Sequence, residues 1–121
     1  MATIDAYFTR QVMADLMADA VAVLQRHPPK TKAASRDKYH NDPQAVWRRR
    51  RIGAACWLAS SEATPWFELL GYNQADKLRY IGWPEQVAGM LEDPVYLAAL
   101  GPSRERMLRE GVAELEKGAE G

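Results

Sequence analysis

The stretch that decides the fold runs from Pro43 to Ser60 and reads PQAVWRRRRIGAACWLAS. Asp42 precedes it, which places a capping side chain directly before a proline, the residue favoured at the first helical position. After the arginines, apolar residues recur at helical rather than alternating spacing. We therefore expect one helix over residues 43–60, with a basic first half and an apolar second half.

The same start signal recurs along the chain, at Thr64-Pro65 and Asp93-Pro94. Trp83-Pro84 and Gly101-Pro102 have the proline without a good cap, and glycines at 71, 82 and 101 are typical helix stops. No stretch alternates like a strand over more than a few residues. The sequence predicts an all-α fold, a compact single-domain bundle of about seven helices, several of them short. The expected helices are 4–26, 43–60, 65–70, 74–81, 84–91, 94–100 and 103–117, in a domain spanning 1–117 with a frayed tail at 118–121.

The first of these helices carries a broad apolar stripe and ends at Pro28-Pro29. We expect this stripe to pack against the rest of the bundle, although part of it could serve a homodimer. Its members are Met13, Leu16, Met17, Ala20, Val21 and Leu24. The four tryptophans, many for a chain of this size, are expected to anchor the core. They are Trp47, Trp57, Trp66 and Trp83.

Length and composition are those of one globular domain. The chain has 121 residues, of which 47% are hydrophobic and 26% charged. Its single cysteine, Cys56, excludes an intrachain disulfide, and we expect a cytoplasmic protein because no signal segment opens the sequence. No apolar run approaches the roughly 20 residues of a membrane span, so no membrane partner is expected.

Charge is distributed unevenly although the net charge is zero. Nine of the sixteen basic residues, but only two of the sixteen acidic ones, lie between Arg26 and Arg51. Such a concentration of one sign bears on partners rather than on fold. It has a loop half, where Lys30, Lys32, Arg36 and Lys38 lie within residues 30–41, and a helical half at Arg48 to Arg51.

Four arginines in a row cover nearly the whole circumference of a helix, because successive residues turn by about 100°. Taking the apolar face from Ile52, Ala55, Cys56 and Ala59, we expect Arg48 to be turned toward the packed side and Arg50 and Arg51 to point away from it. One interpretation is a solvated basic helix with one arginine paired to a carboxylate of the acidic C-terminal half. The others are a phosphate-binding ridge and a docking surface for a protein partner. Trp47, beside the arginines, could stack on a base or on a partner side chain, and Tyr39 could join it.

Residues 66–81, WFELLGYNQADKLRYI, read as helix, tight turn at Gly71 and second helix, with Asn73 as its cap. This resembles the helix–turn–helix of DNA-binding proteins, in which Gln74, Lys77 and Arg79 would face the DNA. The apolar residue comes one place late, at Leu78 where the usual pattern has it at position 77. A packed helix pair through Ala75, Leu78 and Ile81 is expected in either case.

Residues 51–79 also resemble a pattern in small, mostly uncharacterised phage and prophage proteins. These have an alanine-rich helix ending in Trp-Leu-x-Ser, then an aromatic-led helix, a glycine and a charged helix. Here the parts are Ala54, Ala55, Trp57, Leu58 and Ser60, then Phe67, Leu70, Gly71 and Arg79. The resemblance covers about a quarter of the chain. It implies an accessory protein of a phage or mobile element and supplies no catalytic residues.

The sequence contains few residues in arrangements that could support catalysis. His27 and His40 have no Cys or carboxylate at metal-ligand spacing, there is no glycine-rich phosphate loop, and Cys56 is expected to be a buried, inert thiol. No catalytic residue, metal or cofactor is expected. The first hypothesis is a non-enzymatic accessory protein of phage type that binds nucleic acid. The second is a protein-interaction module, an inhibitor or adaptor, that uses the same surface on an acidic partner. The candidate binding residues are Lys30, Lys32, Arg36, Lys38, Trp47, Arg49, Arg50, Arg51, Gln74, Lys77 and Arg79.

Overall fold

The computed structural model describes residues 2–29 and 42–120 and places them in helices joined by short turns, with no strand in those ranges. The all-α prediction is confirmed. The six helices are α1 (Ala2–Gln25), α2 (Pro43–Ala59), α3 (Thr64–Leu69), α4 (Gln74–Tyr80), α5 (Trp83–Leu91) and α6 (Pro94–Glu120). The predicted number of about seven differs by one. Gly101 is non-helical and divides α6 by a kink, but the helix resumes without a connecting loop and continues to Glu120, past the predicted end at 117.

Several helix starts and stops agree with the predicted signals. Asp42 accepts a hydrogen bond from the Gln44 N–H at 3.1 Å, Asn73 from the Asp76 N–H at 3.1 Å, and Asp93 from the Val95 N–H at 2.9 Å. All three stop glycines have positive φ, between 77° and 83°. Thr64 does not act as the predicted cap, because its hydroxyl donates instead to Gln74 Oε1 at 2.7 Å.

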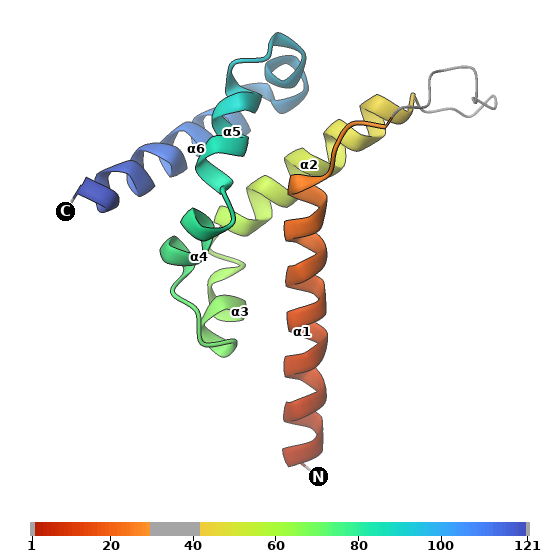
Figure 1. Cartoon of the computed structure of the whole chain (residues 1–121), viewed down its shortest axis with the longest axis vertical. Helices are drawn as coiled ribbons and strands as arrows, with labels where there is room; N and C mark the ends of the chain where they lie inside the picture. The colour runs from red at the N-terminus through yellow and green to blue at the C-terminus, as the bar shows by residue number, and fades with distance from the viewer. Residues whose placement is uncertain (1, 30–41, 121) are drawn as a thin grey trace.

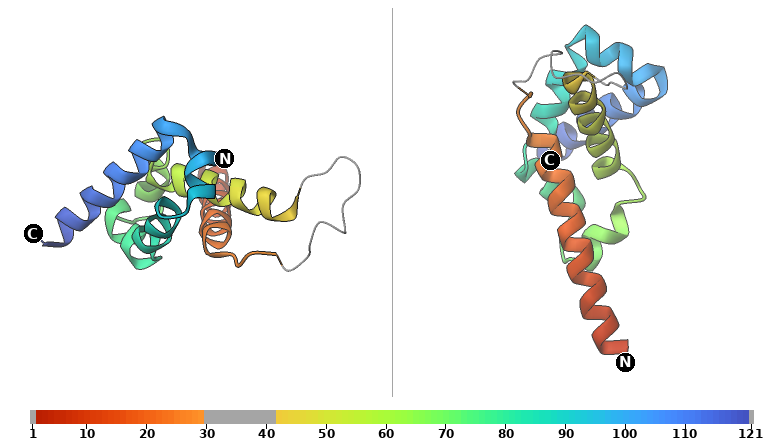
Figure 2. Two further views of the ribbon diagram at one scale, coloured as in Figure 1. Left: turned by 90° about the horizontal axis from the view of Figure 1, so that it is seen from above. Right: turned by 90° about the vertical axis from the view of Figure 1, so that its right-hand side faces the viewer.

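Helix α2 lies at the centre and packs against α1, α4 and α6, while α5 packs along α6. Figure 1 shows α1 crossing α2 near the C-terminal end of α1, with the other end of α1 standing clear of the remaining helices. The right-hand view of Figure 2 shows the same projection. The compact part of the molecule is therefore α2 to α6 together with the second half of α1.

Burial along α1 matches this arrangement. Met17 and Leu24 are buried, whereas Val12 and Leu16 are 38% and 47% exposed. Leu16, a member of the predicted apolar stripe, is therefore not part of the core, whereas Met17 and Leu24 are. No described helix combines the length and apolar character needed to span a membrane.

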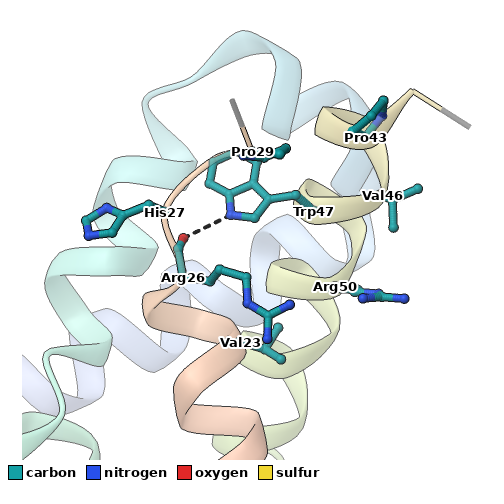
Figure 3. Close-up of a pocket in the computed structure, with 8 residues that line it drawn as sticks. All are labelled: Val23, Arg26, His27, Pro29, Pro43, Val46, Trp47 and Arg50. Carbon is teal, nitrogen blue, oxygen red and sulfur yellow. Dashed lines mark hydrogen bonds between the residues drawn. The ribbon is translucent and has the colours of Figure 1, made fainter. Parts of the chain in front are cut away.

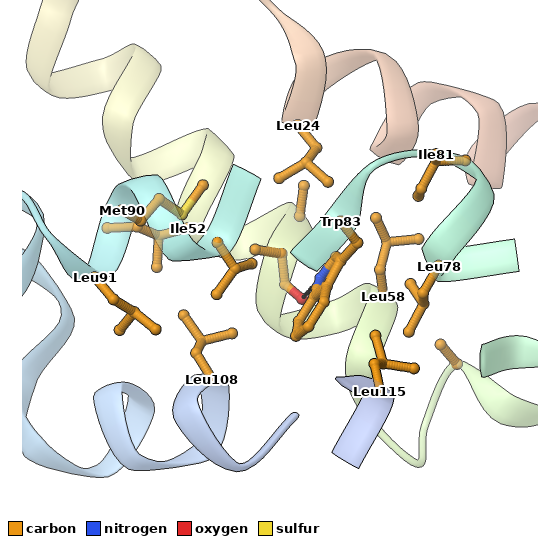
Figure 4. Packing of buried hydrophobic residues seen from close by; sticks show 14 of the residues in the cluster. Leu24, Ile52, Leu58, Leu78, Ile81, Trp83, Met90, Leu91, Leu108 and Leu115 are labelled. Atoms are coloured by element: carbon orange, nitrogen blue, oxygen red, sulfur yellow. Dashed lines mark hydrogen bonds between the residues drawn. The ribbon is translucent and has the colours of Figure 1, made fainter. Parts of the chain in front are cut away.

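Each of the six helices contributes at least one fully or almost fully buried apolar side chain to a single core (Figure 4). Trp83 is the largest and has no exposed surface, and its indole N–H donates to the Ala55 carbonyl at 3.0 Å. Trp57 and Trp66 form an edge-to-face pair with centroids 5.3 Å apart. Trp83 confirms the prediction of a core anchor, and the other pair packs against the core while half-buried.

The Trp83 ring occupies the space that a side chain at Gly111 on α6 would need. An ideal Cβ added to this glycine would lie 2.9 Å from Trp83 Cη2. We expect Gly111→Ala to lower the free energy of unfolding by about 1–2 kcal/mol, because overpacking a rigid core outweighs the higher helix propensity of alanine. Urea denaturation followed by circular dichroism measures this change.

The matched control is Gly53→Ala on α2, where nothing lies within 4 Å of the added methyl group. Helix propensity alone acts there, so this variant should be more stable than the wild type by up to about 1 kcal/mol. Equal stabilisation by both alanines would show that the Trp83 ring does not press on α6 as described.

Candidate functional site

The basic half of α2 passes the C-terminal end of α1, and its four arginines have different surroundings there. Arg49 and Arg50 are exposed, Arg48 is half-buried, and Arg51 is buried with 9% exposure. Arg51 is the one buried charged residue among those whose burial the structure describes. It therefore has to satisfy its guanidinium inside the protein.

Arg51 does so by bonding to three other helices. Its Nε donates to the Leu24 carbonyl at 2.9 Å, its Nη1 to the Tyr96 hydroxyl at 2.6 Å, and its Nη2 to Gln86 Oε1. These partners lie on α1, α6 and α5 respectively. The Arg51 side chain thus links α2 to α1, α5 and α6.

No carboxylate pairs with Arg51 among the described residues. Its guanidinium carbon lies 5.0 Å from the centroid of Trp47 and 5.6 Å from that of Tyr96, within the range of cation–π attraction. Leu24 is in the last turn of α1, where unpaired carbonyls carry the partial negative charge of the helix dipole. Aromatic faces, neutral oxygens and a helix end together compensate this charge.

Arg48 is half-buried and Arg50 exposed, as expected, but the predicted outward orientation of Arg51 was wrong because its side chain is turned inward. The predicted apolar face includes Cys56 and Ala59, which are half-buried, and omits Ala54 and Leu58, which are buried. Arg51, Ala54, Ala55 and Leu58 follow the i, i+3, i+4, i+7 spacing of one helix face. A helical wheel that includes Leu58 places Arg51 on the packed side.

Arg48 is half-buried, and its guanidinium carbon lies 5.8 Å from the centroid of the Tyr96 ring. An acidic partner from the C-terminal half was one interpretation. The three ion pairs of the described residues lie on α4 and α6 and involve none of the arginines at 26 and 48–51. Acidic side chains of the described chain therefore do not neutralise these arginines by direct pairing.

A cavity of about 330 Å³ lies between the end of α1 and the start of α2 (Figure 3). Its carbon surface comes from aliphatic side chains, prolines and an indole, and three basic side chains complete the wall. The lining residues are Val23, Arg26, His27, Pro29, Pro43, Val46, Trp47 and Arg50. We call this space the corner cavity.

Trp47 is fixed at the corner cavity. Its indole N–H donates to the Arg26 carbonyl at 2.9 Å, and its ring meets Tyr96 edge-to-face with centroids 6.3 Å apart. The ring is half-buried and not free-standing, yet it forms part of the cavity wall. Sequence reasoning marked Trp47 and Arg50 but missed Val46, Gln86 and Tyr96.

The loop half of the basic segment lies outside the described residues. Lys30, Lys32, Arg36 and Lys38 all fall within 30–41, as do Tyr39 and His40. Their contribution to the site remains a prediction from the sequence.

The helix–turn–helix residues have other contacts than those expected of a DNA reader. Gln74 Nε2 donates to the carbonyls of Leu58 and Ser60, at 2.9 and 3.2 Å, so it ties α4 to the end of α2. Arg79 pairs with Asp76 at 2.8 Å and contacts the Leu115 carbonyl at 3.4 Å. Both side chains thus make contacts within the protein, to carbonyls near the end of α2 and on α6, whereas the helix–turn–helix interpretation had them facing DNA.

Lys77 and the packed face of the pair meet expectation more closely. Leu78 and Ile81 are buried and Ala75 is half-buried, as predicted. The Lys77 ammonium lies 4.4 Å from the Tyr72 centroid and 5.4 Å from that of Tyr80, and Tyr80 is 85% exposed. Lys77 is thus the one member of the predicted trio with its charge directed toward surface aromatic rings.

Reactive and metal-binding groups are sparse in the described chain. No three His, Cys, Asp or Glu side chains gather at metal-binding distance within it. Cys56 is half-buried rather than fully buried, and burial raises the pKa of its thiol although the positive charge of Arg104 acts in the opposite direction. A raised pKa keeps the thiol protonated and unreactive at neutral pH.

The single thiol makes this measurable. At pH 8 we expect Cys56 of the native protein to react with a disulfide reagent at least several-fold more slowly than in the urea-unfolded chain, after correction for the reagent's own rate in urea. An equal or faster rate in the native state would contradict the assignment of a protonated, shielded thiol.

No family model, curated protein or solved structure that was compared with this chain gave a match. The function has therefore to be inferred from the geometry and charge of the chain's own residues.

The three bonds of Arg51 should be worth a large part of the stability. We expect Arg51→Met to lower the free energy of unfolding by about 3 kcal/mol, because three interior oxygens lose their donor. Arg50→Met, on the exposed side of the same helix, should change it by no more than about 0.5 kcal/mol. Urea denaturation distinguishes the two variants, and similar midpoints for both would exclude the anchoring role of Arg51.

Proposed function

We propose that the chain is a non-enzymatic nucleic-acid-binding protein whose phosphate contacts are made at the corner between α1 and α2. The observation that carries this proposal is the set of arginines at that corner. Arg26, Arg49 and Arg50 are exposed and Arg48 is half-buried, and none of them pairs with a carboxylate of the described chain. We call these four residues the basic corner.

Charge in the rest of the sequence supports the same assignment. The segment from 26 to 51 holds nine basic residues and two acidic ones, and the remainder has an acidic excess. Phosphate binding gains from clustered Lys and Arg because each contact releases condensed counterions. Lys30, Lys32, Arg36 and Lys38 lie outside the described residues, and their part in phosphate binding is proposed from the sequence alone.

Arg51, Gln74 and Arg79 are not part of the proposed interface, because their polar groups already have partners inside the protein. Lys77, on α4, stays as a secondary candidate and does not line the corner cavity. The phage-type resemblance would make the protein an accessory factor of a phage or mobile element, and this stays a proposal.

The proposal is tested by fluorescence anisotropy with labelled single-stranded and duplex oligonucleotides over a range of salt concentrations. Affinity should fall steeply between 50 and 200 mM salt. The double variant Arg49→Ala/Arg50→Ala should bind more weakly, and its slope of log affinity against log salt should be smaller by about 1.4–1.8, because two phosphate contacts are lost.

The matched control removes the same charge from another surface. Arg106 and Arg109 on α6 pair with Glu110 and Glu105, at 3.7 and 3.0 Å, and neither lines the corner cavity. Alanine at both positions should leave the slope unchanged. If neither oligonucleotide binds at 50 mM salt, the proposal is rejected and an acidic protein partner becomes the hypothesis to pursue.

A further inference from the structure

The positive charge of the basic corner does not explain why most of the corner cavity is lined by apolar side chains. Five of its eight lining residues present carbon surface, namely Val23, Pro29, Pro43, Val46 and Trp47. A phosphate is strongly hydrated and gains nothing from such a wall. Phosphates would be held by Arg26 and Arg50, which leaves the apolar part of the cavity for a different portion of the same ligand.

That portion has to be flat and only moderately large. The cavity volume of about 330 Å³ lies at the lower end of the range for small-ligand sites. Trp47 offers an aromatic wall whose position is set in advance by its bond to the Arg26 carbonyl and by Arg51 at 5.0 Å. A ring that is already fixed loses little conformational entropy when a second ring binds against it.

The basic side chains at the cavity indicate which chemical group the ligand's ring is attached to. Figure 3 shows Arg26 just after the end of α1 and Arg50 on α2, the helix that also carries Trp47, with the Arg50 side chain extending away from the indole ring. A planar ring joined to an anionic backbone therefore complements the cavity in both shape and charge. In a duplex the bases are stacked and paired, whereas in a single strand each base can leave the stack and bind an aromatic wall.

We propose that the corner cavity receives one unpaired base of a single-stranded nucleic acid, while the phosphates beside it contact Arg26, Arg49 and Arg50. This inference rests on the proposed function and adds to it the form of the nucleic acid. It assigns Trp47 and Val46 to base binding and the arginines to backbone binding.

The test compares three ligands of equal length at fixed salt: an oligodeoxyadenylate, the same backbone with abasic residues, and a duplex. The oligodeoxyadenylate should bind at least about fivefold more tightly than the abasic strand, since stacking on an aromatic side chain contributes at this level. All three should lose affinity in the Arg49→Ala/Arg50→Ala variant.

A variant that fills the cavity distinguishes base binding from backbone binding. Val46→Phe places a larger side chain in the cavity and should bring the affinity for oligodeoxyadenylate down to that for the abasic strand, with the duplex unaffected. Val12→Phe makes the same enlargement on the projecting half of α1, outside the residues that line the corner cavity, and should change none of the three affinities.

A second measurement uses the unaltered protein, in case Val46→Phe perturbs folding. The indole N–H of Trp47 gives its own signal in a ¹H–¹⁵N correlation spectrum, identified by its loss in Trp47→Phe. Oligodeoxyadenylate should shift this signal and the abasic strand should not. Equal affinities for all three ligands, or equal shifts with and without bases, would overturn the inference and leave the phosphate-binding function standing. Absence of binding by every ligand at 50 mM salt would overturn both.

Discussion

A buried guanidinium that pairs with no carboxylate of the described residues is the constraint on which this fold depends. Arg51 bonds to a carbonyl of α1, an amide of α5 and a hydroxyl of α6, so four helices meet at one side chain. Such an arrangement is stable only if every donor has an acceptor, because the desolvation of an unmatched charge is costly. The positions of Leu24, Gln86 and Tyr96 are therefore linked to one another through α2.

The same interaction also shapes the surface. Holding Arg51 inward sets the rotation of α2, and that rotation places Arg49 and Arg50 outward and Trp47 beside the end of α1. Trp47 contacts Arg51 in the interior and lines the corner cavity on the outside. A structural cation and a candidate binding surface are thus separated by a single aromatic ring.

Local signals in the sequence predicted most of the fold. Caps at Asp42, Asn73 and Asp93 and stops at three glycines arise from short-range chemistry, and they set the helix boundaries within a few residues. The site was harder to predict. Arg51 could have been placed by including Leu58 in the helical wheel, but no local pattern joins it to Tyr96, which lies 45 residues away. The contacts of Gln74 with the Leu58 carbonyl and of Arg79 with the Leu115 carbonyl have the same origin, since those carbonyls are on other helices.

The distances along the chain between Arg51 and its partners, 27, 35 and 45 residues, bear on how the protein folds. Each bond closes a long loop, and the entropy of closing it is recovered only when the helices have docked. The guanidinium should stay hydrated until late in folding, after the individual helices have formed. Arg51 would then influence mainly the rate at which the native protein opens and only slightly the rate at which it forms, so that it prolongs the lifetime of the folded state.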